Sequence, residues 1–389
     1  MEQNKIISIH SFPVWLPQTQ TWMYNQVKYL PDDIEVHVVC EETQHLEQFA
    51  VPNIHCLKDA SRLRFYWEKG LRKLRIRNHL DFVTSTAKKI GARILHSHFG
   101  YIGWANLAVA RQTGMKHIVT FYGEDVNRFP IQDSRWYTRY QTLFAQADQF
   151  LCEGPHMAKC LEKLGCPREK IKVHHLGVTV EEIPYRPREW YPGKEFRVLI
   201  AASFREKKGI PYALEALAKV QFDVALEITM IGDATPDESS QKEKKRIFEI
   251  IENRGLRPKI KMLGFQPYSV LLEEAYKHHV FILPSVTASD GDTEGGAPVV
   301  LIEMMATGMP VVSTSHCDIP SVIQYGMDDW LVDERDAAGL TNRIQWLIEH
   351  SSEWQNLLAL GRKHVEARFD AIQQGEKLGH IYHETIERK

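Results

Sequence analysis

Short apolar runs alternate with stretches of helical periodicity along the first 180 residues. The run 34–40 is rich in β-branched residues and follows a Pro-Asp-Asp break that ends a helical pattern. Such runs predict strands, and apolar residues three or four positions apart predict helices. Their alternation is typical of a parallel, doubly wound α/β sheet. We expect strands at 5–10, 34–40, 92–96, 117–121, 149–153 and 170–174, and helices at 19–30, 104–112, 143–147 and 157–165.

The alternation stops at 181–195 and then begins again. Residues 181–193 hold three prolines and five charged residues, a composition that favours an interdomain linker. Beyond it we expect strands at 196–201, 225–231, 260–263, 280–284 and 310–313, and helices at 210–218, 241–254, 269–278 and 299–307. The pattern therefore predicts two α/β domains, 1–180 and 196–369, facing each other across a ligand-binding cleft.

Composition narrows the class of protein. The 389 residues carry 48 Lys and Arg against 50 Asp and Glu, and 43% are hydrophobic. These values argue against a disordered chain and against a globally basic nucleic-acid binder. The six cysteines form no C-x-x-C pair, the first apolar run is too short for a signal peptide, and no run approaches a membrane span. A cytoplasmic location is therefore the default expectation.

The segment 290–308 carries the strongest local signal for chemistry. Gly295, Gly296 and Ala297 form a loop of little side-chain bulk before a predicted helix, so its amides can approach an anion such as a phosphate. Glu294 and Glu303 lie in the loop and on the helix, where carboxylates can accept hydrogen bonds from hydroxyls. A ligand with phosphates and many hydroxyls is a nucleotide sugar. The alternative is an ordinary loop that enters a core helix, with Glu303 in solvent.

A second segment, 203–209, follows the first strand of the second domain and reads Ser-Phe-Arg-Glu-Lys-Lys-Gly. Its Arg205 can bind a diphosphate with two parallel hydrogen bonds, and its Lys208 can bind it as a point charge. The alternative is a solvated basic turn. Asp290 and Asp292 flank a glycine, but a metal site there is the weaker interpretation, and we expect no metal or other cofactor.

The two segments belong to an ordered set that resembles the retaining glycosyltransferases of family 4, which have the GT-B architecture of two Rossmann-like domains. The resemblance covers nearly the whole chain, and its N-terminal part is similar to enzymes of bacterial exopolysaccharide and O-antigen synthesis. It implies that residues 370–389 form a helix that returns to the first domain. The matching segments are 16–22, 96–100, 120–125, 204–209, 230–233, 263–265, 283–285, 294–308 and 310–314.

The resemblance also implies roles for individual residues of the donor side. Glu303 would hold the ribose hydroxyls, and Glu294 would accept a hydrogen bond from the donor sugar. The amides of Gly295 and Gly296, with Ala297 beside them, would face the sugar and its phosphate. Arg205 and Lys208 would neutralise the leaving diphosphate.

Three positions depart from the family pattern. The two glutamates are nine positions apart instead of eight. Ser203 stands where the family usually has an arginine, and we expect Arg205 to replace it. Tyr122 stands in place of a histidine, and a phenol can donate to a sugar hydroxyl but is no base near neutral pH. By the same resemblance, His98 and Asp125 lie in loops of the cleft.

The implied activity is transfer of a hexose from a UDP- or GDP-sugar, with retention, to a hydroxyl of a saccharide or polyprenyl-linked oligosaccharide in surface polysaccharide synthesis. The leaving phosphate itself can take the acceptor's proton. Two alternatives stay open. One is a GT-B phosphorylase or epimerase, and the other is a catalytically silent partner that binds nucleotide sugars.

A basic segment at 62–77 holds seven Lys or Arg residues in a chain of nearly zero net charge. Leu63, Trp67, Leu71 and Leu74 recur in it at helical spacing. The pattern predicts an amphipathic helix that can meet an anionic membrane surface, which would place the enzyme peripherally on the inner face of the cell membrane. The alternative is a helix whose apolar stripe packs on its own domain.

Overall fold

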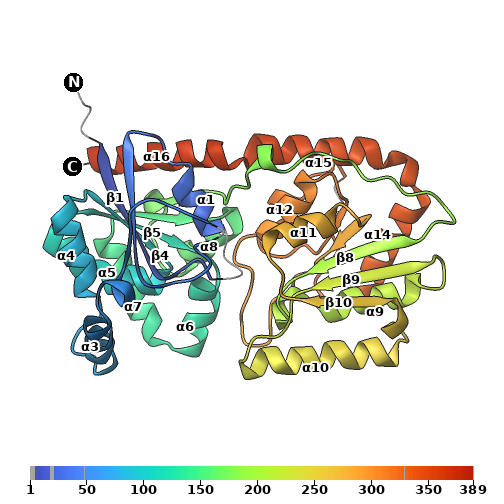
Figure 1. The fold of residues 1–389 in the computed structure, drawn as a ribbon, viewed down its shortest axis with the longest axis horizontal. Helices are drawn as coiled ribbons and strands as arrows, with labels where there is room; N and C mark the ends of the chain where they lie inside the picture. Colours follow the sequence, from blue (N-terminus) through green and yellow to red (C-terminus); the bar gives the residue numbers. More distant parts are fainter. Residues whose placement is uncertain (1–4, 18–21, 48, 328, 389) are drawn as a thin grey trace. The chain divides into compact units, whose positions relative to one another are not determined.

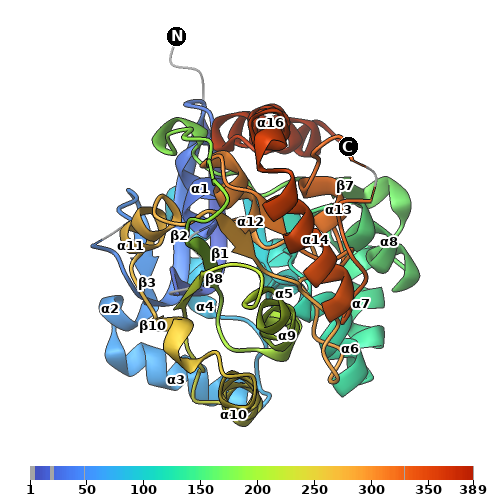
Figure 2. The ribbon, with the colours of Figure 1, turned by 90° about the vertical axis from the view of Figure 1, so that its right-hand side faces the viewer.

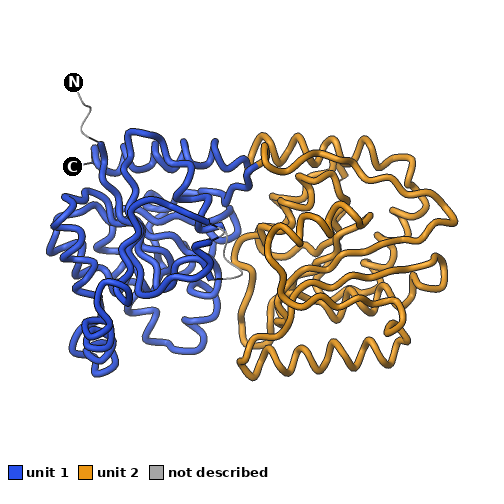
Figure 3. Tube along the Cα trace, viewed as in Figure 1, with its two compact units in different colours: residues 1–179, 370–389 blue, residues 180–369 orange. Residues whose placement is uncertain are grey.

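The computed structural model describes residues 5–17, 22–47, 49–327 and 329–388, and it divides into two compact units. Unit 1 comprises residues 1–179 and 370–389, and unit 2 comprises residues 180–369 (Figure 3). Each unit is built around a parallel sheet with helices on both faces, so the predicted α/β class is confirmed (Figure 1). The loop expected at 16–22 and the start of the helix expected at 19 fall largely on residues 18–21, outside the described residues.

The sheet of unit 1 has the strand order β3-β2-β1-β4-β5-β6-β7. The order reverses between β1 and β4, which is the switch point where open α/β sheets bind ligands. Helices α1 and α16 cover one face, and α4, α5 and α7 cover the other (Figure 1). The strands are β1 (Ile6–Trp15), β2 (Ile34–Thr43), β3 (Ile54–Cys56), β4 (Ile94–His98), β5 (Lys116–Phe121), β6 (Gln149–Cys152) and β7 (Ile171–Val173). The helices are α1 (Trp22–Lys28), α2 (Leu57–Ala60), α3 (Arg62–Lys73), α4 (Asp81–Ile90), α5 (Gly100–Thr113), α6 (Phe129–Gln132), α7 (Arg135–Gln146), α8 (Pro155–Lys163) and α16 (Ala371–Glu387).

The sheet of unit 2 has the order β10-β9-β8-β11-β12, with its switch point between β8 and β11. Helix α9 contacts both α10 and α14 (Figure 2), and α11 and α12 lie on the opposite side of the sheet from α9 and α10 (Figure 1). The strands are β8 (Phe196–Ala201), β9 (Leu226–Ile231), β10 (Ile260–Gly264), β11 (Val280–Ile282) and β12 (Val311–Val312). The helices are α9 (Ile210–Val220), α10 (Glu238–Asn253), α11 (Tyr268–Ala275), α12 (Val299–Ala306), α13 (Ile319–Val322), α14 (Ala337–Glu349) and α15 (Trp354–Arg368).

Strand β1 is longer than its sequence predicts. It runs past His10 and through Pro13, where the sequence favours a loop. Pairing with β4 ends at Ser11, and only β2 pairs with the rest of the strand. A proline is tolerated there because this part of the strand has a partner on one side only.

The segment 181–195 lies in unit 2 instead of spanning open solvent. Arg188 is buried and donates hydrogen bonds to the carbonyl oxygens of Ala275, His278 and Thr307 at 2.8, 3.0 and 3.1 Å. These carbonyls lie at or just past the ends of α11 and α12, where the last turn of a helix has unpaired acceptors. The planar guanidinium therefore anchors the proline-rich segment to unit 2.

Candidate active site

In unit 2, two loops meet at the switch point of the sheet. The cationic loop after β8 continues into the helical turn Glu206–Lys208, and the acidic loop follows β11. Val286 donates a backbone hydrogen bond to the carbonyl of Lys207 at 2.9 Å. Gly209 has a φ of 62°, and a Cβ at this position would collide with the carbonyl oxygen of Pro284. Glycine is therefore needed for the two loops to approach each other.

Lys208 and Glu294 form the central ion pair of these loops. The Lys208 Nζ lies 2.8 Å from Glu294 Oε2, and the Ser285 hydroxyl donates to Glu294 Oε1 at 2.8 Å. Burial alone would raise the pKa of Glu294, but Lys208 and Lys207 lower that pKa to about 2. The carboxylate is therefore ionised and uses both oxygens, and the lysine beside it is the cation that the sequence predicts for a diphosphate.

A second ionic group joins the same loops. The Lys207 Nζ lies 3.1 Å from Asp292 Oδ1, and Arg205 Nη2 lies 3.7 Å from Asp292 Oδ2. The Asp292 side chain is 5% exposed. Since its carboxylate already has two cationic partners from the protein, it is poorly suited to bind a metal ion.

The glycine loop before α12 differs from its expected form. The Gly295 N–H donates to Thr293 Oγ1 at 3.1 Å, and the Gly296 N–H donates to the carbonyl of Glu294 at 2.9 Å. Both amides thus take part in the loop's own turns, because Gly295 adopts a φ of 75° and folds the loop back on itself. In this conformation both N–H groups are already hydrogen-bonded within the loop, and Ala297 beside them is half-buried.

Glu303 lies on α12 and is 7% exposed. Burial raises its pKa to about 7, although a hydrogen bond with Tyr268 opposes the shift. A glutamate at this position is neutral or ionised depending on small changes near neutral pH. Ser203 is half-buried in the loop after β8, and its carbonyl oxygen accepts a hydrogen bond from the Arg205 N–H at 2.8 Å.

A histidine that the sequence left without a role fixes the Glu294 backbone. His316 Nε2 accepts the Glu294 N–H at 3.2 Å, and its Nδ1 lies 2.6 Å from Glu334. His316 and Glu334 therefore support the acidic loop from a later part of unit 2. Their spacing in the sequence gave no signal, because each contact depends on the tertiary fold.

In unit 1, Tyr122 follows β5 and is 8% exposed. Its hydroxyl lies 2.6 Å from His98 Nδ1 and accepts a hydrogen bond from Gln26 at 3.2 Å. Its ring packs against Trp22 at a centroid distance of 4.3 Å. Burial raises the pKa of Tyr122 well above its ordinary value, so the phenol is neutral.

Asp125, which the resemblance places in a loop of the cleft, binds backbone groups of unit 1. It is fully buried in the helical turn Glu124–Arg128, and its carboxylate accepts the N–H groups of Gly100 at 2.7 Å and of Tyr122 and Gly123 at 3.0 Å. Asp125 therefore ties the loops after β4 and β5 together, and its effect on a ligand would act through Tyr122.

Helix α3 presents an unusual face to solvent. Leu63 is 87% exposed and Leu74 is 71% exposed, and Tyr66, Trp67 and Ile76 are 68–69% exposed. Phe65 and Glu68 face unit 1 instead. Within the part of the chain that the structure describes, the neighbouring cations Arg62, Lys73 and Arg75 have no ion-pair partner. The apolar stripe that the sequence predicts is therefore on the outer surface, except for half-buried Leu71.

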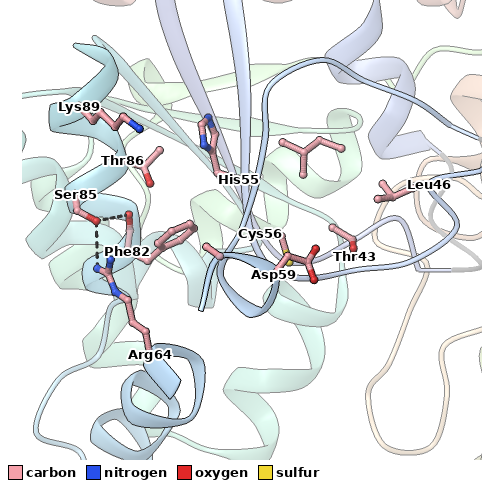
Figure 4. A pocket seen from close by; sticks show the side chains of 12 residues that line it. Thr43, Leu46, His55, Cys56, Asp59, Arg64, Phe82, Ser85, Thr86 and Lys89 are labelled. Atoms are coloured by element: carbon pink, nitrogen blue, oxygen red, sulfur yellow. Dashed lines mark hydrogen bonds between the residues drawn. The ribbon is translucent and has the colours of Figure 1, made fainter. Parts of the chain in front are cut away.

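A pocket of about 610 Å³ lies beside this helix (Figure 4). Arg64 enters it from α3 and donates to Ser85 on α4 at 3.2 Å, and Lys89 and His55 line the same space. None of the residues expected at the active site lines this pocket.

Comparison with known proteins shows the family of the chain. Residues 184–364 match the family model described as glycosyl transferases group 1, and residues 19–182 match that of glycosyltransferase family 4. A protein of Escherichia coli K12 named colanic acid biosynthesis glycosyltransferase WcaL is 35% identical over 72% of this chain and 67% of its own. The chain belongs to glycosyltransferase family 4.

Other relatives of this glycosyltransferase agree with the assignment. The amylovoran biosynthesis glycosyltransferase AmsK of Erwinia amylovora is 33% identical over 74% of this chain and 69% of its own. Two solved structures share the fold. HepE of Anabaena, solved with UDP and glucose, has a TM-score of 0.77 at 15% identity over 97% of this chain and all of its own. Sucrose-phosphate synthase of Thermosynechococcus elongatus has a TM-score of 0.75 at 18% identity over 99% of this chain and all of its own. The predicted GT-B fold and transferase class are thus confirmed.

Proposed function

We propose that this glycosyltransferase moves a hexose from a UDP- or GDP-sugar, with retention, to a saccharide hydroxyl in the synthesis of a surface polysaccharide. The observation that carries the proposal is the cluster of cations at the switch point of unit 2, where Lys208 lies 2.8 Å from Glu294. Colanic acid and amylovoran synthesis, named for the relatives WcaL and AmsK, support the polysaccharide class.

The donor would bind to unit 2 through its phosphates and its hydroxyls. Lys208 and Arg205 would meet the diphosphate, and Glu303 would accept hydrogen bonds from the ribose. The HepE structures with UDP and glucose and with UDP-glucose support a uridine nucleotide. Glu294 would exchange part of its bond with Lys208 for a donor-sugar hydroxyl, which leaves that lysine free to turn toward the phosphate.

The chemical step would rest on stabilising the leaving group. Negative charge grows on the diphosphate as the glycosidic bond breaks, and cations already in place lower the energy of that transition state. The acceptor hydroxyl attacks the same face of the sugar, and the leaving phosphate takes its proton. The cations come from the protein, so we propose that no metal ion or other cofactor takes part.

The acceptor is proposed to be a saccharide or a polyprenyl-linked oligosaccharide presented at a membrane surface. The exposed apolar residues of α3, with Arg62, Lys73 and Arg75 beside them, support a contact with anionic lipid at the inner face of the membrane. No helix among the described residues has the length and apolar character to cross a bilayer.

Activity measurements test the donor site. Thermal-shift screening against UDP-, GDP- and ADP-sugars identifies the donor, because a ligand that binds only the folded state raises its stability. With that donor, Lys208→Ala and Glu303→Ala should each lower nucleotide release, Lys208→Ala by about 10²–10³-fold. The control Lys245→Ala changes a lysine side chain that is 80% exposed on α10 and should have no effect. Unchanged rates in both site variants would refute the proposed site.

The product separates the alternatives. A new glycoside with the donor's anomeric configuration supports retaining transfer. A sugar phosphate would indicate a phosphorylase, an isomerised donor would indicate an epimerase, and binding without turnover would indicate a silent partner.

Vesicle co-sedimentation tests the membrane contact. Leu63→Ser with Trp67→Ser should reduce binding to anionic vesicles, whereas Phe222→Ser, at a side chain that is 84% exposed in unit 2, should not. Equal binding to neutral and anionic vesicles would contradict the electrostatic part of the proposal.

A further inference from the structure

Three histidines lie on one face of the sheet of unit 1. His10 on β1 pairs in register with His96 on β4, and His98 is two residues further along β4. Residues two apart in a strand point to the same face. All three are 0% exposed, and the face they share is covered by α1 and α16. Burying three imidazoles is costly unless every ring nitrogen is hydrogen-bonded.

The structure gives each of these nitrogens a partner. We call the resulting chain of side chains the histidine relay. Its links are Tyr122 OH to His98 Nδ1 at 2.6 Å, His98 Nε2 to His10 Nδ1 at 3.0 Å, His10 Nε2 to Tyr382 OH at 3.0 Å, Tyr382 OH to His96 Nδ1 at 2.6 Å, and His96 Nε2 to Thr120 Oγ1 at 2.6 Å.

The protonation states of the relay are coupled. Burial lowers the pKa of His10 to about 3 and those of His96 and His98 well below the ordinary value, so each ring is neutral. A neutral imidazole has one donor and one acceptor nitrogen. When the relay is followed from Tyr122 to Thr120, the Nδ1 of each histidine is bonded to the preceding side chain and its Nε2 to the following one. All links can be made at once, with the Tyr382 proton also donated within the relay, only if the three histidines carry their proton on the same nitrogen.

A metal site is the competing interpretation, because suitable nitrogens of the three rings lie within 4.8 Å of one another. The ring geometry disfavours it. His96 and His98 stack with an interplanar angle of 25°, and His10 and His98 with one of 23°. Nearly parallel rings do not direct their in-plane lone pairs at a common point, as the tetrahedral coordination of zinc requires.

We propose that His10, His96, His98 and Tyr382 are positioning residues that hold the Tyr122 phenol and set the direction of its hydroxyl proton toward a saccharide ligand. The proposal rests on the proposed function and on the role that the family resemblance implies for Tyr122, whose phenol can donate to a sugar hydroxyl. With the proton on Nδ1 throughout, His98 donates to Tyr122, and the Tyr122 proton is left for the weak bond to Gln26 Oε1 at 3.5 Å or for a ligand oxygen that replaces it. With the proton on Nε2 throughout, Tyr122 spends its proton on His98 and offers only a lone pair.

The first test reads the tautomers directly. Long-range ¹H–¹⁵N correlation spectra of the full, ¹⁵N-labelled, ligand-free chain at pH 7 distinguish Nδ1–H from Nε2–H, and single histidine substitutions assign the signals. We expect one tautomer shared by His10, His96 and His98, and no change on adding equimolar zinc sulfate. Mixed tautomers, a charged ring or zinc bound by the three rings would overturn the proposal.

The second test breaks the relay far from Tyr122. Tyr382→Phe removes the hydroxyl between His10 and His96 and should lower kcat by about 3- to 10-fold, the value of one hydrogen bond, with the donor KM unchanged. Tyr325→Phe is the matched control, since it removes a buried phenol that accepts a hydrogen bond from Val311 N–H in unit 2. Equal kcat values for the two variants would also overturn the proposal. If the unaltered chain transfers no sugar, the proposed function fails, and the tautomers alone decide the relay.

Discussion

Each unit buries a polar cluster near the switch point of its parallel sheet, but the two clusters differ in charge. In unit 1 the histidine relay is neutral, and its members are joined by hydrogen bonds of 2.6–3.0 Å. In unit 2 the cluster is ionic, with Lys208 paired to Glu294 at 2.8 Å and Lys207 to Asp292 at 3.1 Å.

The difference matches two kinds of ligand chemistry. A neutral network orients a hydroxyl and depends on having every link in place. An ionic cluster presents fixed charge, which is what a departing diphosphate needs. The comparison therefore predicts different responses to acid and to the loss of one member.

We expect the largest difference between the two clusters in how much stability each loses at acidic pH. The relay histidines stay neutral in the folded chain, where the pKa of His10 is about 3. In the unfolded chain a histidine has its ordinary pKa of 6.5, so below pH 6.5 the unfolded chain binds more protons than the folded chain. Stability from the relay therefore falls as the pH drops below 6.5, by about 2 kcal/mol per histidine at pH 5. Glu294 has a folded pKa of about 2, so its contribution is lost only as the pH falls below 4.5.

Hydrogen exchange at pH 7 and pH 5, corrected for intrinsic rates, measures this difference. Peptides from β1 and β4 should lose protection, and peptides from 202–209 and 283–298 should keep it. Equal losses in both sets would contradict the contrast between neutral and ionic clusters.

Removing one member of the ionic cluster should have the next largest effect. Lys208→Ala leaves the Glu294 carboxylate buried without its cation, and breaking a buried pair in this way costs about 3–5 kcal/mol. Lys208→Ala with Glu294→Gln removes both charges and should recover much of that loss. Urea unfolding of the three proteins gives the values, and a double variant no more stable than Lys208→Ala would argue against a buried charge as the cause.

Removing one hydrogen bond of the histidine relay should lower the free energy of unfolding by less than Lys208→Ala does. Thr120→Val keeps the side-chain shape and leaves His96 Nε2 without its partner at 2.6 Å. An unsatisfied buried group costs about 1–3 kcal/mol, so we expect a loss in that range by urea unfolding. A loss below about 0.5 kcal/mol, typical of a surface position, would mean that the relay is not a connected unit.

Some of this contrast could be predicted from the sequence. The alternating pattern gives both sheets, and the loops that hold Arg205, Lys208 and Glu294 follow strands as expected. Parallel strands bring such loops together whatever their distance in the chain. The ion pair itself was not predicted, because only the fold shows that the cation and the carboxylate meet.

The relay was beyond reach of the sequence. His96 bonds Tyr382 across 286 positions, and neither residue lies in a pattern that predicts the contact. The pairing of the Gly295 and Gly296 amides within their own loop was not predicted either, because the path of a tight turn depends on individual φ values. The three backbone amides that Asp125 binds were likewise not predicted from the sequence.

Glu303 sharpens the comparison because it is an acid of unit 2 that is still partly protonated at pH 7. Its folded pKa is about 7, raised by burial. Ribose hydroxyls that donate to the carboxylate favour its ionised form, so binding must first remove a proton below pH 7. The affinity for a nucleotide sugar should therefore fall by up to about tenfold for each pH unit below 7.

Calorimetric titration with a nucleotide sugar between pH 5.5 and 8 measures this slope, since the diphosphate diester does not itself titrate there. Glu303→Gln carries no proton to release and should bind with an affinity that does not change with pH. If Glu303→Gln kept the slope, another group would be responsible. If the affinity of the unaltered chain did not change with pH, Glu303 would keep its proton in the complex. The contrast between ionic and neutral clusters would then depend on which side chains touch a ligand, and not on which unit holds them.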